Sequence, residues 1–244
     1  MDKMNQRANS PGYFITLEGC EGSGKTSLLR ELQTRLASDN LLLTITREPG
    51  GTQIGDQVRD VLHSHNNNIM VPQAELLGYM MSRAQNVGEV IQEKLREGRV
   101  ILQDRFIDSS TAYQGFGHGL GAYTVDWLNN FATRGIVPDL TIFVDVDPKE
   151  GIERKRREAE RKLGGEWNRM DALPLEFHSK VQYAYRTLYA HDETGRWEKV
   201  DGNQAFELVV EQSLKIVRSR LEKAGFIEGS RSVERTSFGV ERQG

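Results

Sequence analysis

The sequence predicts one α/β domain built around a parallel sheet, and two features of the chain support this fold class. Short β-rich runs alternate with longer segments of helical periodicity, as in successive βα units. Two of the runs, LLLTITR at 41–47 and LTIFVD at 140–145, are apolar nearly throughout, which is typical of strands covered by helices on both faces. The chain has 244 residues, enough for such a doubly wound domain and its core.

The alternation assigns a range to each expected element. We expect strands at 13–18, 41–47, 100–104, 140–145 and 197–201. Helices are expected between and after them, at 25–38, 53–64, 73–97, 123–133, 148–161, 173–192 and 204–223. Gly98 stands where a glycine commonly ends a helix, and Pro148 suits a first helical turn.

The ends of the chain differ in composition from its middle. Residues 1–10 form a polar extension, and residues 227–244 are a polar tail with few apolar side chains. No Pro/Gly/Ser-rich linker divides the chain between them. We therefore expect a single domain over 11–226.

The bulk composition argues against several classes of protein. Charged residues make up 27% of the chain and the net charge is −3, which speaks against a protein that grips nucleic acid through a positive surface. No apolar run approaches the roughly 20 residues that cross a bilayer, and the first residues lack the apolar core of a signal peptide. The single cysteine, Cys20, has no partner for an internal disulfide. We expect a cytoplasmic protein without a membrane or nucleic-acid partner.

The most specific motif is GCEGSGKT at 19–26, which satisfies G-x-x-x-x-G-K-[ST] between an expected strand and an expected helix. Glycines let the backbone N–H groups converge on phosphate oxygens, and the N-terminus of the following helix presents its positive dipole end to them. The sequence therefore predicts a nucleotide-binding loop made of Gly19, Cys20, Glu21, Gly22, Ser23, Gly24, Lys25 and Thr26.

Two residues of this loop have chemistry of their own. Lys25 places a full positive charge at the β- and γ-phosphates, and the Thr26 hydroxyl can bind Mg²⁺. The motif by itself leaves GTPases, ATPases and small-molecule kinases open.

Charged residues also follow two other expected strands. Asp104 ends the strand 100–104 and suits the water shell of Mg²⁺, although an Asp104–Arg105 pair that merely caps a strand at the surface has the same sequence. Arg47 ends the strand 41–47 before a turn with a proline and two glycines, and a guanidinium there can bind a phosphate through two parallel hydrogen bonds.

The motifs GCEGSGKT, TREPGGT, DRFIDSSTAYQG and PDLTIFVDVDP occur in the order and at the spacings of bacterial thymidylate kinases, so the chain resembles that family from about residue 13 to 223. The resemblance implies the P-loop kinase fold, with a five-stranded parallel sheet flanked by helices on both faces and an arginine-rich lid. It implies transfer of the γ-phosphoryl group of ATP to dTMP, giving dTDP and ADP in dTTP synthesis. It further implies a requirement for Mg²⁺ and usually a homodimer.

The resemblance also assigns roles around the reacting phosphates. Arg47 would bind the phosphate of dTMP, with Arg105 beside it, and both would offset its repulsion from the γ-phosphate of ATP. Glu21 would contact the 3′ position of the deoxyribose or the metal. A phosphate oxygen is already an anionic nucleophile, so no general base is required.

For the base and the sugar, the resemblance points to the helix 73–97 and the loop 108–115. Tyr79 and Arg83 are four residues apart on one helical face, where the ring would stack on thymine and the guanidinium would donate to a base carbonyl. The family usually has phenylalanine at the position of Tyr79. Ser110 would face the base, Tyr113 would lie beneath the sugar, and Gln114 would help to hold dTMP.

The lid is expected at about 153–170, where the chain is rich in arginine. Some members of the family carry an arginine in the phosphate loop, whereas this chain has Gly22 and Ser23 at the variable positions. The resemblance therefore implies that a lid arginine reaches the transferred phosphoryl group. We favour Arg156 and Arg157 among the candidates, which are Arg154, Arg156, Arg157, Arg161 and Arg169. A solvated helix end has a similar composition.

Three other functions remain alternatives. One is a kinase of the same fold that acts on another nucleoside monophosphate, such as deoxycytidylate or guanylate. Another is a P-loop NTPase switch, against which the absence of an N-K-x-D motif and the presence of the acceptor-site arginines both speak. The last is a nucleotide-binding protein that has lost catalysis, although Lys25, Thr26 and Asp104 are all present.

Overall fold

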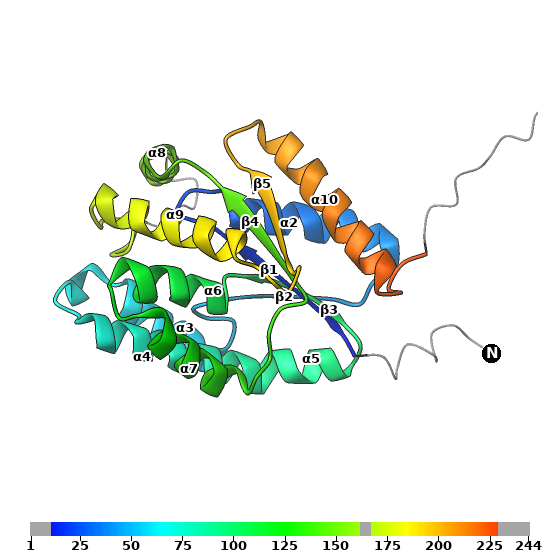
Figure 1. The fold of residues 1–244 in the computed structure, drawn as a ribbon, viewed down its shortest axis with the longest axis horizontal. Helices are drawn as coiled ribbons and strands as arrows, with labels where there is room; N and C mark the ends of the chain where they lie inside the picture. The colour runs from blue at the N-terminus through cyan, green and yellow to red at the C-terminus, as the bar shows by residue number, and fades with distance from the viewer. Residues whose placement is uncertain (1–10, 162–166, 229–244) are drawn as a thin grey trace, which may run out of the picture.

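The computed structural model describes residues 11–161 and 167–228, and it confirms a parallel sheet with helices on both faces (Figure 1). The strands are β1 (Tyr13–Glu18), β2 (Leu43–Arg47), β3 (Val100–Asp104), β4 (Leu140–Asp145) and β5 (Trp197–Asp201). They are all parallel, in the order β2-β3-β1-β4-β5. The expected strand ranges are confirmed except that β2 begins at Leu43 rather than at residue 41.

Apart from α6, the helical segments begin and end within two residues of the expected ranges. They are α2 (Lys25–Leu36), α3 (Gln53–His63), α4 (Pro72–Asn86), α5 (Gln92–Arg96), α6 (Ile107–Ser110), α7 (Ala122–Thr133), α8 (Pro148–Glu160), α9 (Leu175–Ala190) and α10 (Phe206–Lys223). The single helix expected over 73–97 is α4 and α5 joined by a π-helical turn, Val87–Ile91. No helix within the described ranges is long and apolar enough to cross a membrane.

One helical segment was missed by the sequence prediction. Residues 108–115, expected as a loop, lie in α6 and in the π-helical stretch Thr111–Gly117 that continues it. Gly119 and Gly121 then adopt positive φ angles of 73° and 85° and turn the chain into α7. The side chains expected to read the base are therefore mounted on a helix, where packing fixes their direction.

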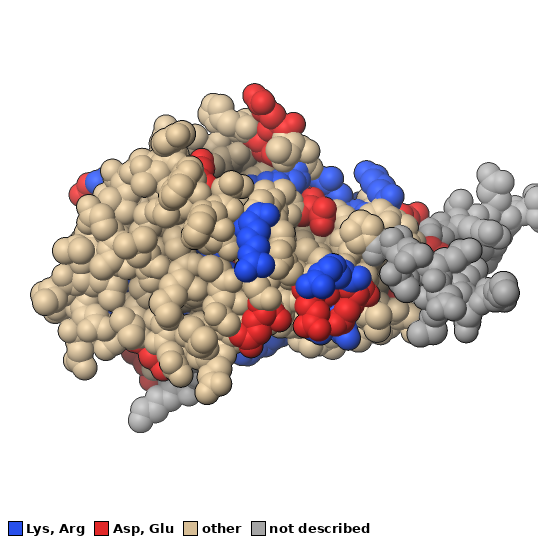
Figure 2. All heavy atoms as spheres, turned by 90° about the horizontal axis from the view of Figure 1, so that it is seen from below, with Lys and Arg blue, Asp and Glu red and all other residues tan. Residues whose placement is uncertain are grey.

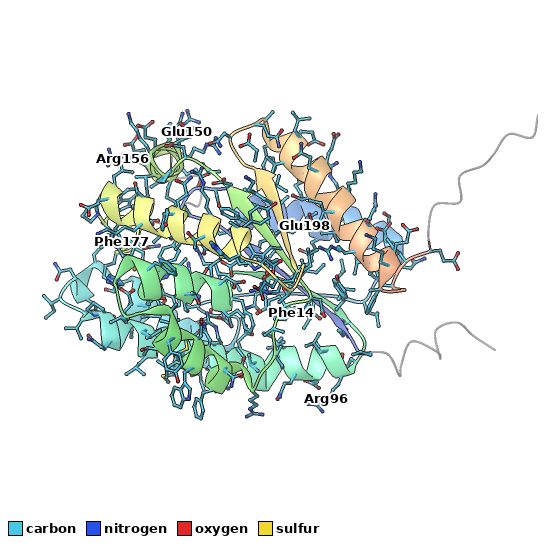
Figure 3. The ribbon with its side chains drawn as sticks, in the orientation of Figure 1. Phe14, Arg96, Glu150, Arg156, Phe177 and Glu198 are labelled. Atoms are coloured by element: carbon cyan, nitrogen blue, oxygen red, sulfur yellow. The ribbon has the colours of Figure 1, made fainter. Side chains whose placement is uncertain are left out.

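Successive side chains of β1 point to opposite faces of the sheet and contribute to separate parts of the core. Ile15 and Leu17 pack with leucines of α2 and valines of α10 on one face. Phe14 points to the other face, where its ring meets Phe106 with centroids 4.9 Å apart. Figures 1 and 3 show α2 and α10 on one side of the sheet, α4, α5 and α7 on the other, and Phe14 between these layers.

The domain extends slightly beyond its expected end. Phe226 packs edge-on against Tyr13, with ring centroids 5.7 Å apart, and Ile227 also contacts the core. Ile227 therefore belongs to the domain rather than to the polar tail expected over 227–244. The rest of that tail from residue 229, and the extension 1–10, lie outside the described residues.

Candidate active site

The carboxyl ends of β1, β2 and β3 open onto one cavity. The chain runs from β1 to β2 on one side of β1, whereas after β3 it crosses to β4 on the other side. In such sheets, ligands bind at the carboxyl ends of the strands where the strand order reverses in this way. The cavity brings together most of the predicted site residues: Glu21, Gly22, Ser23, Gly24, Lys25, Thr26, Arg47, Tyr79, Asp104, Arg105, Ser110, Tyr113 and Gln114. Gly19, Cys20, Arg83, Arg156 and Arg157 do not line it.

The phosphate loop is shaped by glycines and held by Lys25. Gly24 has a φ of 85° immediately before α2 begins, and a Cβ on Gly22 would collide with the backbone of Gly151. The Lys25 ammonium donates to the carbonyls of Gly19 and Cys20, at 2.9 Å and 2.8 Å. Burial, with the charge of Arg105 adding to it, lowers the pKa of Lys25 to about 8. Lys25 therefore remains largely cationic at neutral pH.

Thr26 and Asp104 form a pair of oxygen ligands suited to Mg²⁺. The Thr26 hydroxyl donates to the Asp104 carboxylate at 2.6 Å, although the two residues are 78 positions apart in the chain. Mg²⁺ prefers oxygen ligands and retains several waters, so one hydroxyl, one nearby carboxylate and substrate phosphates fit it. The described residues contain no group of three His, Cys, Asp or Glu side chains that could hold a metal unaided.

Arg105 lies at the centre of the site and has an unusual backbone. Its φ of 66° is in the left-handed region, which is uncommon for a residue other than glycine and recurs at functional sites. Its guanidinium donates to Glu21 at 2.9 Å and to the Gly19 carbonyl at 3.1 Å, and it lies over the Tyr113 ring, 5.0 Å from the centroid. The turn after β3 thus directs this side chain back onto the phosphate loop.

The charge of Glu21 is stabilised by its surroundings. Burial raises the pKa of Glu21, but the Arg105 guanidinium and the Lys25 ammonium outweigh it and hold the pKa well below its usual range. The Tyr113 hydroxyl also donates to this carboxylate, at 3.1 Å. Glu21 is therefore an ionised acceptor between the phosphate loop and Tyr113.

Arg47 is held less tightly than Arg105. Its side chain is 55% exposed and forms an ion pair with Asp56 on α3 at 3.0 Å. Gly50 and Gly51 follow with φ angles of 120° and 80°, and they turn the chain from β2 toward α3. Arg47 can therefore exchange Asp56 for a ligand without leaving the rim of the cavity.

Arg83 does not line the cavity, although the family resemblance implies that it contacts the base directly. It is 1% exposed and donates to Glu48 at 2.8 Å and to the Ser110 hydroxyl at 2.9 Å. Further donors go to the Asn129 side chain at 2.5 Å and the Phe106 carbonyl at 2.8 Å. The partners come from three segments and satisfy this buried guanidinium, which thus supports Ser110 from behind.

The favoured lid arginines also lie away from the cavity. Arg156 stands over the ring of Trp167 at 5.6 Å, and Arg157 donates to Glu150 at 3.1 Å. Arg156 and Glu150 both lie on α8, at the upper left of Figure 3. Residues 162–166 of the expected lid are outside the described residues.

The cavity instead receives Lys155 and Glu158 from α8, two residues that no sequence motif indicated. Gly151 lies so close to the phosphate loop that a Cβ there would collide with the Glu21 carbonyl. Positions 155 and 158 follow Gly151 by four and seven residues, so they share its helical face. In the sequence of α8, only Gly151, a glycine within a highly charged helix, indicates which face of the helix meets the phosphate loop.

Other lining residues escaped prediction because they belong to no motif. Arg59 and His63 reach the cavity from α3, and Asn168 and Met170 from the segment before α9. Their residue types occur throughout the chain, so tertiary packing alone identifies them.

Comparisons with known proteins agree with this geometry. The family model for thymidylate kinase matches residues 17–213. The thymidylate kinase of Bacillus velezensis is 41% identical over 87% of this chain and 98% of its own, and that of Pelobacter propionicus is 43% identical over 86% and 96%. Among solved structures, the thymidylate kinase from Ehrlichia chaffeensis matches with a TM-score of 0.67 and 28% identity, over 85% of this chain and 99% of its own. With its phosphate loop, its paired Thr26 and Asp104, and its arginines at the ends of β2 and β3, the chain belongs to the thymidylate kinase family.

Proposed function

We propose that this protein transfers the γ-phosphoryl group of ATP to dTMP, giving dTDP and ADP. The observation that carries the proposal is that the phosphate loop and two strand-end arginines, Arg47 and Arg105, line the same cavity. One end can bind a nucleoside triphosphate and the other a monophosphate, so that the two phosphate groups meet. The names of the relatives supply the identity of the acceptor.

The ATP end consists of the loop 19–26. Its backbone N–H groups and the start of α2 bind the phosphates, and Lys25 turns from the loop carbonyls to the β- and γ-phosphates. Mg²⁺, held through Thr26 and Asp104, would neutralise charge on these phosphates during transfer.

At the acceptor end, Arg47 binds the phosphate of dTMP and Arg105 lies between the two phosphates. Arg105 contacts the Gly19 carbonyl of the phosphate loop, so its charge is already in place there. Placing cations between two polyanions lowers the barrier to their approach, and charge fixed in advance costs no reorganisation. The attacking phosphate oxygen is anionic, so no side chain has to remove a proton.

In this proposal, the base lies between Tyr79 and the helical stretch that contains Ser110 and Gln114. Tyr79 stacks on the thymine ring, while Ser110 and Gln114 face its polar edge. Arg83 acts through Ser110, because its guanidinium donates to that hydroxyl and leaves the hydroxyl proton for a base carbonyl. Tyr113 and Glu21 border the sugar.

We assign the cation of the lid to Lys155 rather than to Arg156 or Arg157. Lys155 is the basic residue of α8 that lines the cavity, and it is linked to the segment before α9 by Asp171 at 3.8 Å. A lysine provides a point charge for the transferred phosphoryl group.

We further propose that the protein is a homodimer that buries an apolar stripe on α7. Tyr123, Trp127 and Phe131 recur every four residues, are each more than half exposed, and Trp127 stacks on Phe131. Leu77 and Met81 of the neighbouring α4 are also more than half exposed. Figure 2 shows the molecule from below, and the part of this face formed by α4 and α7 is largely free of Lys, Arg, Asp and Glu. Large uncharged patches of this kind mark protein interfaces.

An acceptor panel tests the main proposal. The protein is incubated with ATP, Mg²⁺ and one of dTMP, dUMP, dCMP, GMP or dGMP, and ADP formation is followed. We expect dTMP to give the highest kcat/KM. A higher value with dCMP or GMP would assign the chain to another acceptor, and ADP formation that no monophosphate stimulates would indicate an NTPase.

A further inference from the structure

Glu75 is a buried carboxylate to which the proposed reaction gives no role. It lies in the first turn of α4, where the helix dipole favours an acid, and it is 1% exposed. One carboxylate oxygen accepts from the Gln114 amide at 2.8 Å and from His118 at 3.0 Å. The other accepts from Arg169 at 2.6 Å. Three donors, two from the helical stretch that ends at His118 and one from Arg169, thus converge on one carboxylate.

These donors keep Glu75 ionised. Burial by itself raises the pKa of Glu75, but the hydrogen bonds from His118, Gln114 and Arg169 outweigh it, and the pKa stays below its usual value. An ionised carboxylate has acceptors only. The Gln114 side chain can therefore face Glu75 only through its NH₂ group.

The orientation of Gln114 determines what it offers to the cavity. With the NH₂ group on Glu75, the amide oxygen is left for the cavity that Gln114 lines. That oxygen accepts no hydrogen bond from the residues that the structure describes, and it is not among the buried atoms that lack a partner. A side-chain amide free to turn would offer either a donor or an acceptor, but this one offers an acceptor.

An acceptor at this position distinguishes pyrimidine bases. The N3 position of thymine or uracil carries a proton and donates, whereas N3 of cytosine has a lone pair and accepts. A buried acceptor facing cytosine N3 would leave two acceptors opposed and unpaired, a mismatch that sites built on hydrogen bonds reject strongly.

We propose that Glu75 is a specificity-determining positioning residue that locks the Gln114 amide with its oxygen toward the base, and thereby selects bases that carry an N3 proton. The inference rests on the proposed function, because it assumes that the base lies against Gln114. Glu75 itself does not touch the substrate. His118 and Arg169 hold the carboxylate in place for this purpose.

The central test is Glu75→Gln, which keeps the shape of the side chain but adds a donor. Its amide can donate to the Gln114 oxygen, so that Gln114 can turn its NH₂ group toward the base. We expect kcat/KM for dTMP relative to dCMP to fall roughly 10-fold or more, mainly through the KM for dTMP. The ratio of dTMP to dUMP should be unchanged, because both bases carry the N3 proton. The KM for ATP should also be unchanged.

Two further variants separate positioning from a general loss of packing. Arg169→Lys keeps a cation beside Glu75 but loses the bond from Arg169 Nε to the Leu62 carbonyl, so it should lower the melting temperature and leave the dTMP to dCMP ratio intact. Gln114→Leu should lower that ratio by itself and should abolish any further effect of Glu75→Gln.

The outcomes are distinct. If wild-type protein prefers dTMP but folded Glu75→Gln keeps the wild-type dTMP to dCMP ratio, the inference is wrong and the proposed function stands. The inference would also be overturned if Glu75→Gln lowered the dTMP to dCMP ratio as much in the Gln114→Leu variant as in wild type. If Glu75→Gln does not fold, an unchanged ratio in Gln114→Leu overturns it. A wild-type protein without dTMP kinase activity would instead reject the proposed function.

Discussion

Arg47 ends β2 and Arg105 directly follows β3 at the same cavity, yet their surroundings differ. The Arg105 side chain is 16% exposed and has several fixed acceptors, whereas that of Arg47 is 55% exposed and has one carboxylate partner. Exposed ion pairs contribute only about 0–1 kcal/mol to stability, so Arg47 can leave Asp56 for a phosphate at little cost. We infer that Arg105 organises the site in advance and that Arg47 responds to the acceptor.

We therefore predict that Arg47→Ala impairs dTMP use without impairing ATP binding. Steady-state kinetics should show kcat/KM for dTMP lowered by roughly 100-fold or more, as expected when a charged contact to a reacting group is lost, with the KM for ATP within twofold of wild type. The matched control is Asp56→Asn, which weakens the same ion pair but keeps the guanidinium. Equal losses in the two variants would contradict a direct role for Arg47.

At the scale of elements, α8 and the segment 167–171 form one side of the site. Gly151 fixes the face of α8 that packs on the phosphate loop, and Lys155 on that face reaches Asp171 at 3.8 Å. Asp171 accepts from the Asn168 backbone N–H at 2.8 Å through one oxygen, while its other oxygen has no partner within the described residues. Burial, together with the nearby charge of Glu21, raises the pKa of Asp171 to about 7.

This raised pKa makes the stability of the protein depend on pH. Between the pKa of about 4 in the unfolded chain and that of about 7 in the folded one, the folded state binds the proton more tightly. The contribution of protonated Asp171 to the free energy of unfolding is thus fully present below pH 4 and is lost as the pH rises through about 7. Asp171→Asn should remove this loss and raise the free energy of unfolding at pH 8 by roughly 2–4 kcal/mol relative to its effect at pH 4.

Urea unfolding of wild type and Asp171→Asn at pH 4, 6 and 8 measures this difference. Asp192→Asn is a suitable control, because hydrogen bonds from Thr194 and Trp197 more than offset its small burial and lower the pKa of Asp192. The free energy of unfolding of Asp192→Asn relative to wild type should therefore fall as the pH rises. If the free energies of unfolding of wild type and Asp171→Asn changed in parallel with pH, ionisation of Asp171 would not destabilise the folded protein.

Over the whole molecule, the basic residues of the cavity and the aromatic stripe of α7 occupy different surfaces. The cavity receives basic side chains from the phosphate loop, β2, α3, β3 and α8. The stripe of Tyr123, Trp127 and Phe131 lies on α7, and Figure 2 shows few charged side chains over the part of the lower face that α4 and α7 form. None of these three residues lines the cavity.

Trp127→Glu tests the proposed homodimer. The side chain is 61% exposed, so the charge costs little in a single folded copy, but it would be buried in a dimer and would weaken association by several kcal/mol. Sedimentation equilibrium should show a dimer for wild type and a monomer for the variant. Tyr183→Glu on α9, at a residue 67% exposed, is the control and should remain dimeric. A monomeric wild type would refute the proposal.

The sequence alone predicts the order of the strands and the longer helices, the phosphate loop, and the strand ends at Arg47, Asp104 and Arg105. These features are local or follow from a general rule: hydrophobic patterns set strands and helices, and parallel strands bring their carboxyl ends to one edge. Only the packing of distant segments places Arg83 behind Ser110 and brings Lys155, rather than Arg156, to the cavity. Those outcomes depend on which face of a helix meets the cavity, and that is set by contacts between residues far apart in the chain, such as Gly151 against Gly22, which no local pattern specifies.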